Sequence, residues 1–207
     1  MDHGFKGPVS GTSMASAGGA IAIGEAFRLV KNGYADRILA GGFDYNVNAN
    51  CVGGMNAFKA VTRSFNDDPE GAMRPFDARR SGTVISDGGA LLMLETEESA
   101  AKRGALDKAY GEIGGFNMNC DAFHALRPTS TGVGLISAIQ EAMIEAGVVP
   151  SDISAFNCHA TSTPVGDASE AQCITSILAA NQRHQISSVE DFRRLTPEQI
   201  SELNSLE

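Results

Sequence analysis

The chain has 207 residues, enough for one medium domain or two small ones, and 43% of them are hydrophobic, with 23 glycines. This composition favours a packed α/β protein over a disordered one. The formal net charge of −9 argues against nucleic acid as the main partner, because binding to phosphates requires a basic surface.

The cysteines and the N-terminal residues indicate the cellular compartment. None of the four cysteines has a Cys-x-x-Cys spacing (Cys51, Cys120, Cys158, Cys173). The thiols are therefore predicted to be reduced, as in a protein of the cytoplasm or of an organelle such as the mitochondrion. Neither disulfides nor a metal site are expected. The start MDHGFKGP lacks the basic and apolar regions of a signal peptide, so secretion is not expected. No apolar run reaches the length of a membrane span.

The first half of the chain predicts two strands and two helices. After Ser16, apolar side chains recur at helical spacing, and Gly33 stands where a C-terminal cap would. The elements that we expect next are a buried strand, a loop-rich stretch, a second strand and a short exposed helix (36–42, 43–82, 88–96, 97–104).

The second half continues the alternation of strands and helices. Expected here are a strand, a helix that ends at Gly147, another strand and another helix (110–116, 131–148, 153–160, 167–180). Asp167 and Glu170 have the spacing of a capping-box variant, which would place Asp167 at the N-cap and Glu170 in the first turn. The alternation predicts βαβ units and a largely parallel or mixed sheet, hence an α/β fold.

The tail, residues 181–207, is polar and differs from the rest of the chain. TPEQISELNSLE predicts an exposed helix with Thr196 as N-cap and Pro197 at the first helical position.

The turn GTSMASAGG (residues 11–19) is the first candidate for chemistry, and three interpretations of it compete. Ser13 lies in a Gly-Thr-Ser-Met-Ala sequence that subtilisin-like proteases carry around their nucleophile. Ser16 could occupy a nucleophile position at the start of a helix, where the helix dipole favours an anion. The third interpretation is an ordinary turn of small residues that packs against a helix.

NCHATSTPVGDASE (residues 157–170) is the second candidate. His159 closes a predicted strand and could act as a general base or an oxyanion donor, because its pKa lies near neutral pH. Thr161 and Thr163 could line one wall of a channel, whereas Cys158 should point to the opposite face, into the core. A histidine with ordinary hydrogen bonds in a polar loop is the alternative.

These segments together resemble the β-ketoacyl-acyl-carrier-protein synthases of the thiolase-like superfamily, and most closely the elongating type. GPVSGTSMASAGGAIAIGEAF resembles the strand and helix around their nucleophile, and RPFDARRSGTVISDGGALLMLE a later conserved segment. CDAFH and NCHATSTPVGDASE resemble two further segments in the same order. The resemblance covers about residues 6–178, so it is more specific than any single motif.

The resemblance implies a layered αβαβα fold from which the first strands and the C-terminal part are missing. It places residues 1–96 at the end of the N-terminal half and 97–180 at the start of the C-terminal half, and leaves 181–207 as a tail unlike the family. Ser16 falls where the family has the cysteine that takes the acyl chain. His159 matches the first family histidine, whereas the second has no match and Glu190 stands where a lysine is expected.

The resemblance also implies the partners. Thr161 and Thr163 match residues that bind the phosphopantetheine arm of acyl carrier protein, and Lys59 matches a basic residue that docks this carrier. Glu170 matches an acid that works with the absent lysine, and Asp167 supports it structurally. The family uses no cofactor beyond the arm of the carrier and forms homodimers, so a homodimer or a heterodimer with a complete synthase is expected.

Three functions follow as hypotheses. The first is the family's acyl transfer, decarboxylative condensation with malonyl-carrier in fatty acid elongation, weakened because a serine alcohol cannot be ionised near neutral pH as a thiol can. The second is a non-catalytic ketosynthase-like subunit or fragment that binds acyl carrier protein. The third is a serine hydrolase that uses Ser13 or Ser16 with His159.

Overall fold

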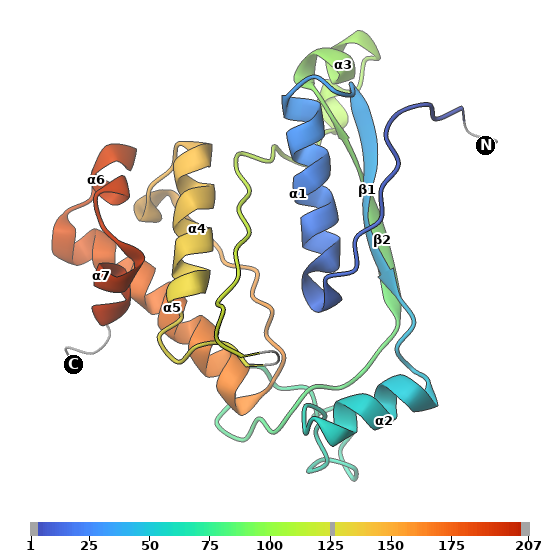
Figure 1. Cartoon of the computed structure of the whole chain (residues 1–207), viewed down its shortest axis with the longest axis vertical. Helices are drawn as coiled ribbons and strands as arrows, with labels where there is room; N and C mark the ends of the chain where they lie inside the picture. Colours follow the sequence, from blue (N-terminus) through green and yellow to red (C-terminus); the bar gives the residue numbers. More distant parts are fainter. Residues whose placement is uncertain (1–3, 125–126, 204–207) are drawn as a thin grey trace. The chain divides into compact units, whose positions relative to one another are not determined.

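The computed structural model describes residues 4–124 and 127–203, which form two compact units. The first unit contains the chain up to Tyr45 together with Asp87–Ile113. The second contains Asn46–Ser86 together with the chain from Gly114 onward. Figure 1 shows the elements of both units in sequence colours, and each unit is described by itself.

The first unit is built on an antiparallel strand pair. β1 and β2 pair over their full lengths, from Arg37 opposite Glu95 to Asp44 opposite Gly88. The elements of this unit in chain order are η1 (Ala15–Ala17), α1 (Gly18–Lys31), β1 (Arg37–Asp44), β2 (Gly88–Glu95), α3 (Glu97–Lys102) and η2 (Leu106–Lys108). The predicted helix after Ser16, both strands and the short helix at 97–104 are therefore confirmed, but the first strand is not buried as predicted, since only Ala40 of β1 is buried.

Helix α1 packs along one face of the strand pair (Figure 1). Small side chains make this close approach possible. Ala26 and Val30 form the core with Ala40 and Leu94. A Cβ atom at Gly42 would lie 3.1 Å from the Gly19 Cα atom, so the first turn of α1 packs directly on the β1 backbone.

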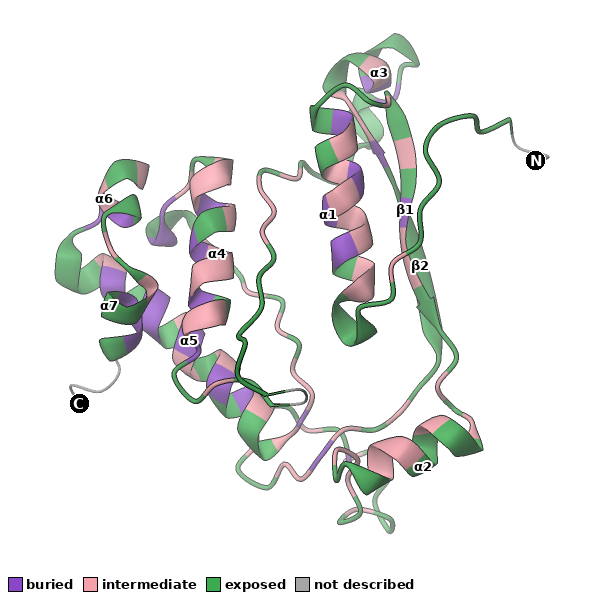
Figure 2. Ribbon diagram, viewed as in Figure 1, coloured by how far each residue is buried: buried purple, intermediate pink, exposed green. Residues whose placement is uncertain are grey.

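The other face of the strand pair is apolar and exposed. Side chains alternate along a strand, so the face opposite Ala40 and Leu94 carries Leu39, Met93 and Leu91. All three are exposed, and Figure 2 shows β2 exposed along most of its length. The described residues of this unit thus cover only one face of the sheet with a helix.

The second unit is mostly helical. Its elements in chain order are α2 (Ala49–Ala57), α4 (Val133–Ala146), η3 (Pro150–Asp152), α5 (Pro164–His184), α6 (Val189–Arg193) and α7 (Pro197–Glu202). As predicted, Gly147 ends α4 in a left-handed conformation, with φ of 73°. Thr196 and Pro197 begin α7 as predicted, with a capping box completed by Gln199.

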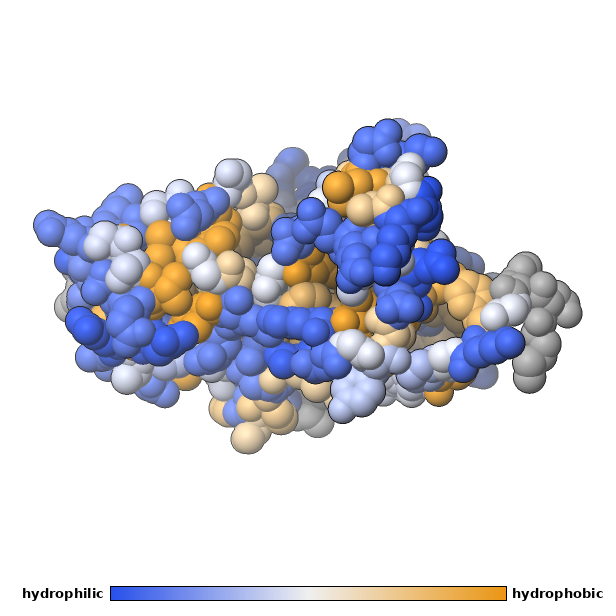
Figure 3. Space-filling view, turned by 90° about the horizontal axis from the view of Figure 1, so that it is seen from above, coloured by the Kyte–Doolittle hydropathy of each residue, from blue (hydrophilic) through white to orange (hydrophobic). Residues whose placement is uncertain are grey.

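The tail is exposed only in part, whereas the prediction was an exposed helix. Phe192 and Ile200 have no exposed surface, and both pack with Ile136 and Ile177 of α4 and α5 in the largest described core. The buried Gln140 amide donates hydrogen bonds of 2.8 Å to the Phe192 and Leu195 carbonyl oxygens. Figure 2 shows the buried positions along α4, α5 and α7, and Figure 3 shows apolar side chains that remain at the surface of this helical unit.

Several secondary-structure predictions are wrong, and the stretch 43–82 that was expected to be loop-rich contains helix α2. Residues 110–116 and 153–160 form no strand, because among the described residues no neighbouring strand completes their hydrogen bonds. The described sheet is accordingly a two-stranded antiparallel pair rather than a parallel or mixed one. Helix α5 begins at Pro164, three residues before the predicted start, and continues to His184.

Candidate active site

The first part of the candidate site is the turn that leads into α1. Ser16 lies in the 3-10 turn η1, directly before the start of α1 at Gly18. The preceding Ala15 has φ of 48°, a left-handed conformation that is costly for a residue with a Cβ atom. Backbone strain next to a candidate nucleophile is typical of a functional turn.

The surroundings of this turn suit an acyl acceptor. Ser13 and Ser16 are both exposed. The first turn of α1 consists of Gly18, Gly19, Ala20 and Ile21. The Gly18 N–H already donates to the Ala15 carbonyl, so it is the positive end of the helix dipole that favours negative charge near Ser16. A thiol at this position would gain from that field, whereas an alcohol additionally needs a base.

The second part of the site is the loop that carries His159. The Glu170 carboxylate accepts the main-chain N–H of His159 at 2.6 Å and that of Ala160 at 2.8 Å. Ala160 and Ser162 have φ values of 51° and 62°. A strained backbone of this kind persists only where surrounding contacts stabilise it. The two hydrogen bonds to Glu170 are part of that stabilisation.

Two threonine hydroxyls follow His159 in the same loop. Thr161 Oγ1 and Thr163 Oγ1 are 2.9 Å apart and hydrogen-bonded, and both side chains are half-buried. The Thr163 hydroxyl also accepts the Gly166 N–H, so Thr163 is the N-cap of α5. A Cβ atom at Gly166 would come 2.5 Å from Thr163 Oγ1, so glycine keeps room for this pair.

The predicted roles of Asp167 and Glu170 as a capping box are wrong. Because α5 begins at Pro164, Asp167 lies within the helix and Glu170 one turn further along. Asp167 is fully buried and accepts the Phe76 N–H at 2.7 Å. Glu170 instead reaches back to the His159 loop. The sequence showed the acids but not the true start of the helix, which Pro164 at the first position could have indicated.

Cys158 does not point into the core as predicted, since it is only half-buried. Burial and the neighbouring carboxylates of Glu170 and Asp167 raise the pKa of its thiol above the usual value. The thiol is therefore kept protonated next to His159, and it is a poor nucleophile there.

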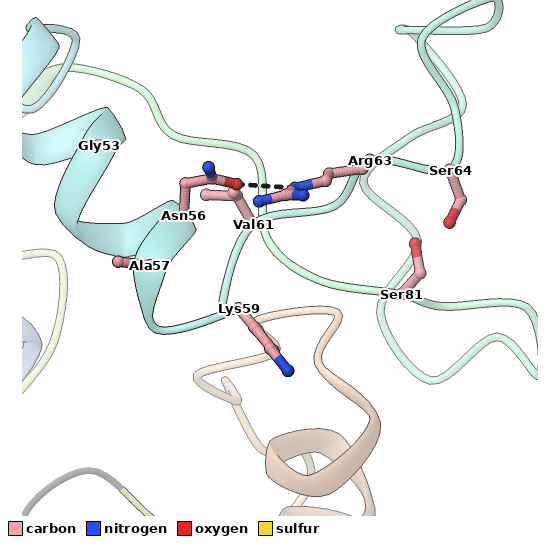
Figure 4. A pocket seen from close by; sticks show the side chains of 8 residues that line it. All are labelled: Gly53, Asn56, Ala57, Lys59, Val61, Arg63, Ser64 and Ser81. Atoms are coloured by element: carbon pink, nitrogen blue, oxygen red, sulfur yellow. Dashed lines mark hydrogen bonds between the residues drawn. The ribbon is translucent and has the colours of Figure 1, made fainter.

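Lys59 lies at an open pocket of about 500 Å3 in the second unit (Figure 4). It follows α2 in a left-handed conformation, with φ of 57°, and its side chain is exposed. Arg63 lines the same pocket and donates a 2.7 Å hydrogen bond to Asn56. The pocket therefore carries two cations. Arg63 was not among the predicted site residues, although its position four residues after Lys59 could have suggested a shared surface.

The structure brings His159, Thr161, Thr163, Asp167 and Glu170 together in one loop and helix start. Ser16 belongs to the first unit and this loop to the second, so the proximity of Ser16 to His159 stays a prediction. Within residues 4–124 and 127–203, no group of three or more histidine, cysteine or acidic side chains could hold a metal. No helix in those ranges has the length and hydropathy to cross a membrane.

Two family models match the chain. The model of the β-ketoacyl synthase N-terminal domain matches residues 1–100, and the model of the β-ketoacyl synthase C-terminal domain matches residues 110–192. The chain belongs to the β-ketoacyl synthase family. Both halves of a ketosynthase are thus represented in it, with α1 in the first and the His159 loop in the second.

Curated ketosynthases agree with this assignment. The mitochondrial 3-oxoacyl-acyl-carrier-protein synthase of Arabidopsis thaliana is 40% identical over 179 residues, which cover 86% of this chain and 38% of that protein. The 3-oxoacyl-acyl-carrier-protein synthase 2 of Staphylococcus aureus is 40% identical over 193 residues, covering 93% of this chain and 47% of that protein. The chain spans less than half the length of these relatives.

Solved ketosynthases share the fold. One, determined with a type II polyketide acyl-carrier protein and a bound hexaketide, superposes with a TM-score of 0.79 at 30% identity, over 83% of this chain and 41% of that one. A β-ketoacyl synthase from Burkholderia phymatum gives a TM-score of 0.74 at 35% identity, over 81% and 40%. The ketosynthase chain described here therefore has a thiolase-like α/β fold, and it covers part of that architecture.

Proposed function

We propose that this chain carries the acyl-acceptor turn and the carrier-arm loop of a ketosynthase that acts on acyl groups bound to acyl carrier protein. The observation that supports it most is the His159 loop, in which Glu170 holds the backbone and two threonine hydroxyls lie side by side. Hydroxyls in this arrangement suit the amides of a phosphopantetheine arm, which need both donors and acceptors. The arm belongs to the substrate, so no further cofactor is required.

Lys59 and Arg63 supply the docking charge in this proposal. Carrier proteins of this class are acidic, and two cations at one open pocket would steer such a partner. The solved ketosynthase with its bound acyl-carrier protein supports this partner by analogy. A homodimer or a pairing with a complete synthase, and a cytoplasmic or organellar location, belong to the same proposal. The mitochondrial relative supports an organelle.

Ser16 limits the chemistry that we propose. A thiol ionises at a pKa of ~8.5 and forms a thioester, whereas an alcohol stays protonated without a dedicated base. Condensation by this chain is therefore expected to be slow, and each tenfold loss in rate corresponds to ~1.4 kcal/mol of barrier. With a cysteine at position 16, the proposed reaction is the elongation of fatty acids by decarboxylative condensation with malonyl-carrier.

Ser16→Cys is the variant that tests this function. We expect the variant to form an acyl adduct at residue 16 after incubation with acylated carrier protein, and the parent to form little or none, because only the thiol ionises at the helix start. Intact-mass analysis followed by peptide mapping measures the adduct.

Ser13→Cys is the matched control, because it places an exposed thiol three residues earlier in the same turn. Labelling of the control equal to that of Ser16→Cys would contradict the assignment of residue 16. Binding of the carrier without loading of any variant would favour the non-catalytic subunit. Ester hydrolysis by the parent that is lost in Ser13→Ala would favour a serine hydrolase.

A further inference from the structure

A second segment, far from the His159 loop in sequence, also holds that loop. The Arg74 N–H donates to Ser162 Oγ at 3.2 Å, and the Gly82 N–H donates to the Ser162 carbonyl at 2.9 Å. Ser162 is fully buried between these two contacts. Residues 74–82 therefore bind the strained part of the loop directly.

Arg80 is the centre of this segment. Its guanidinium donates to the Thr163 carbonyl at 3.2 Å, to the Pro164 carbonyl at 2.8 Å and to the Asp77 carbonyl at 3.1 Å. Its Nε also lies 3.7 Å from the buried Asp167 carboxylate. The planar Arg80 guanidinium thus connects the start of α5 with the loop that carries Arg80. It does so with several donors in a fixed fork, which lysine lacks.

The charge of Asp167 requires such a partner. Its carboxylate has no exposed surface, and one of its oxygens has no hydrogen-bond partner among the described residues. A buried charge is costly unless an opposite charge and hydrogen bonds compensate it. Arg80, whose side chain is 20% exposed, supplies that compensation while it binds the backbone on either side of Thr163.

We infer that Arg80 is a positioning residue that sets where the Thr161 and Thr163 hydroxyls stand for the carrier arm. It contacts neither hydroxyl and acts through the backbone of Thr163 and Pro164. The inference rests on the proposed function for the identity of the ligand. The placement of the two threonines by Arg80 is a separate, measurable property of the free chain.

Arg80→Lys in the full chain tests the inference, with Arg79→Lys as the matched control. Arg79 is the adjacent arginine, its side chain is 74% exposed, and it pairs with Asp77 of its own loop. We expect the methyl NMR signals of Thr161 and Thr163 to move in Arg80→Lys and to stay in Arg79→Lys. We also expect pantetheine to bind about tenfold more weakly to Arg80→Lys, the loss of roughly one hydrogen bond between a displaced threonine hydroxyl and the ligand.

The outcomes separate the inference from the proposed function. Unchanged threonine signals in Arg80→Lys would overturn the inference, whether or not pantetheine binds. Threonine signals that move in Arg80→Lys would support the positioning role even if the parent does not bind pantetheine. Absence of pantetheine binding to the parent would contradict the carrier-arm function alone. If Arg80→Lys does not fold, Arg80→Gln at the same position keeps a planar donor group without the charge or the full fork of donors. In that variant too, moved signals support the inference and unmoved signals overturn it.

Discussion

At the scale of single residues, the site depends on side chains that hold an unfavourable backbone. Ala15, before Ser16, and Ala160, after His159, both have positive φ values. Glu170 holds Ala160 through a main-chain hydrogen bond, and the cost of the strain is offset by such contacts. The two candidate reactive residues thus lie beside the same kind of strained position, although they belong to different units.

The cysteine thiols allow a prediction at this scale. Burial, chiefly, raises the pKa of the Cys173 thiol to about 11, whereas Cys120 is exposed. At pH 8 we expect iodoacetamide to alkylate Cys120 first and Cys173 last, because the thiolate is the reactive form. Peptide mass spectrometry over time measures the order. In urea all four cysteines should react at similar rates, and fast labelling of Cys173 in the folded chain would contradict the structure.

At the scale of elements, the short helices α6 and α7 depend on packing. They have five and six residues, far below the length at which an isolated helix is stable in water. Each has a side-chain N-cap, from Ser188 and Thr196. Phe192 and Ile200 then bury their side chains completely against α4 and α5, and Gln140 satisfies carbonyl groups where α6 ends.

Phe192→Ala tests this packing. We expect it to lower the free energy of unfolding of the helical unit by about 3–5 kcal/mol, the usual cost of deleting a fully buried phenylalanine. The neighbouring Arg193→Ala should change it by less than about 1 kcal/mol, since the exposed Arg193–Glu190 ion pair contributes little. Urea titration followed by circular dichroism measures both. Equal effects of the two substitutions would show that α6 does not pack as described.

At the scale of the whole molecule, apolar surface remains exposed on one face of the strand pair. Leu39, Leu91 and Met93 lie together there, opposite α1, and all are exposed. Contiguous apolar patches of this kind mark interaction surfaces or sites of aggregation. This face is therefore the candidate interaction surface of the first unit.

We expect the chain at micromolar concentration to associate through this face. Replacing Leu91 and Met93 together by lysine should move the sedimenting mass toward the 21.7 kDa of a monomer. Tyr110→Ser is the control, because Tyr110 is fully exposed outside the strands. Sedimentation velocity measures the shift. A parent that already sediments as a clean monomer would contradict the expectation.

Local signals in the sequence determined a large part of this protein. Helical spacing and glycine caps predicted α1 and α4, and the ordered segments around Ser16 and His159 predicted the ketosynthase family. These features depend on neighbouring residues, or on patterns that a family shares along the chain, so one sequence is enough to carry them.

Only the tertiary structure decided the rest. Thr163 rather than Asp167 caps α5, and Glu170 reaches eleven residues back to His159. Arg80 meets Thr163 across more than eighty residues of chain. Segments that read as strands stay unpaired among the described residues, and a polar tail buries Ile200. Hydrogen-bond pairing and burial depend on which distant groups come into contact, and no local pattern encodes that.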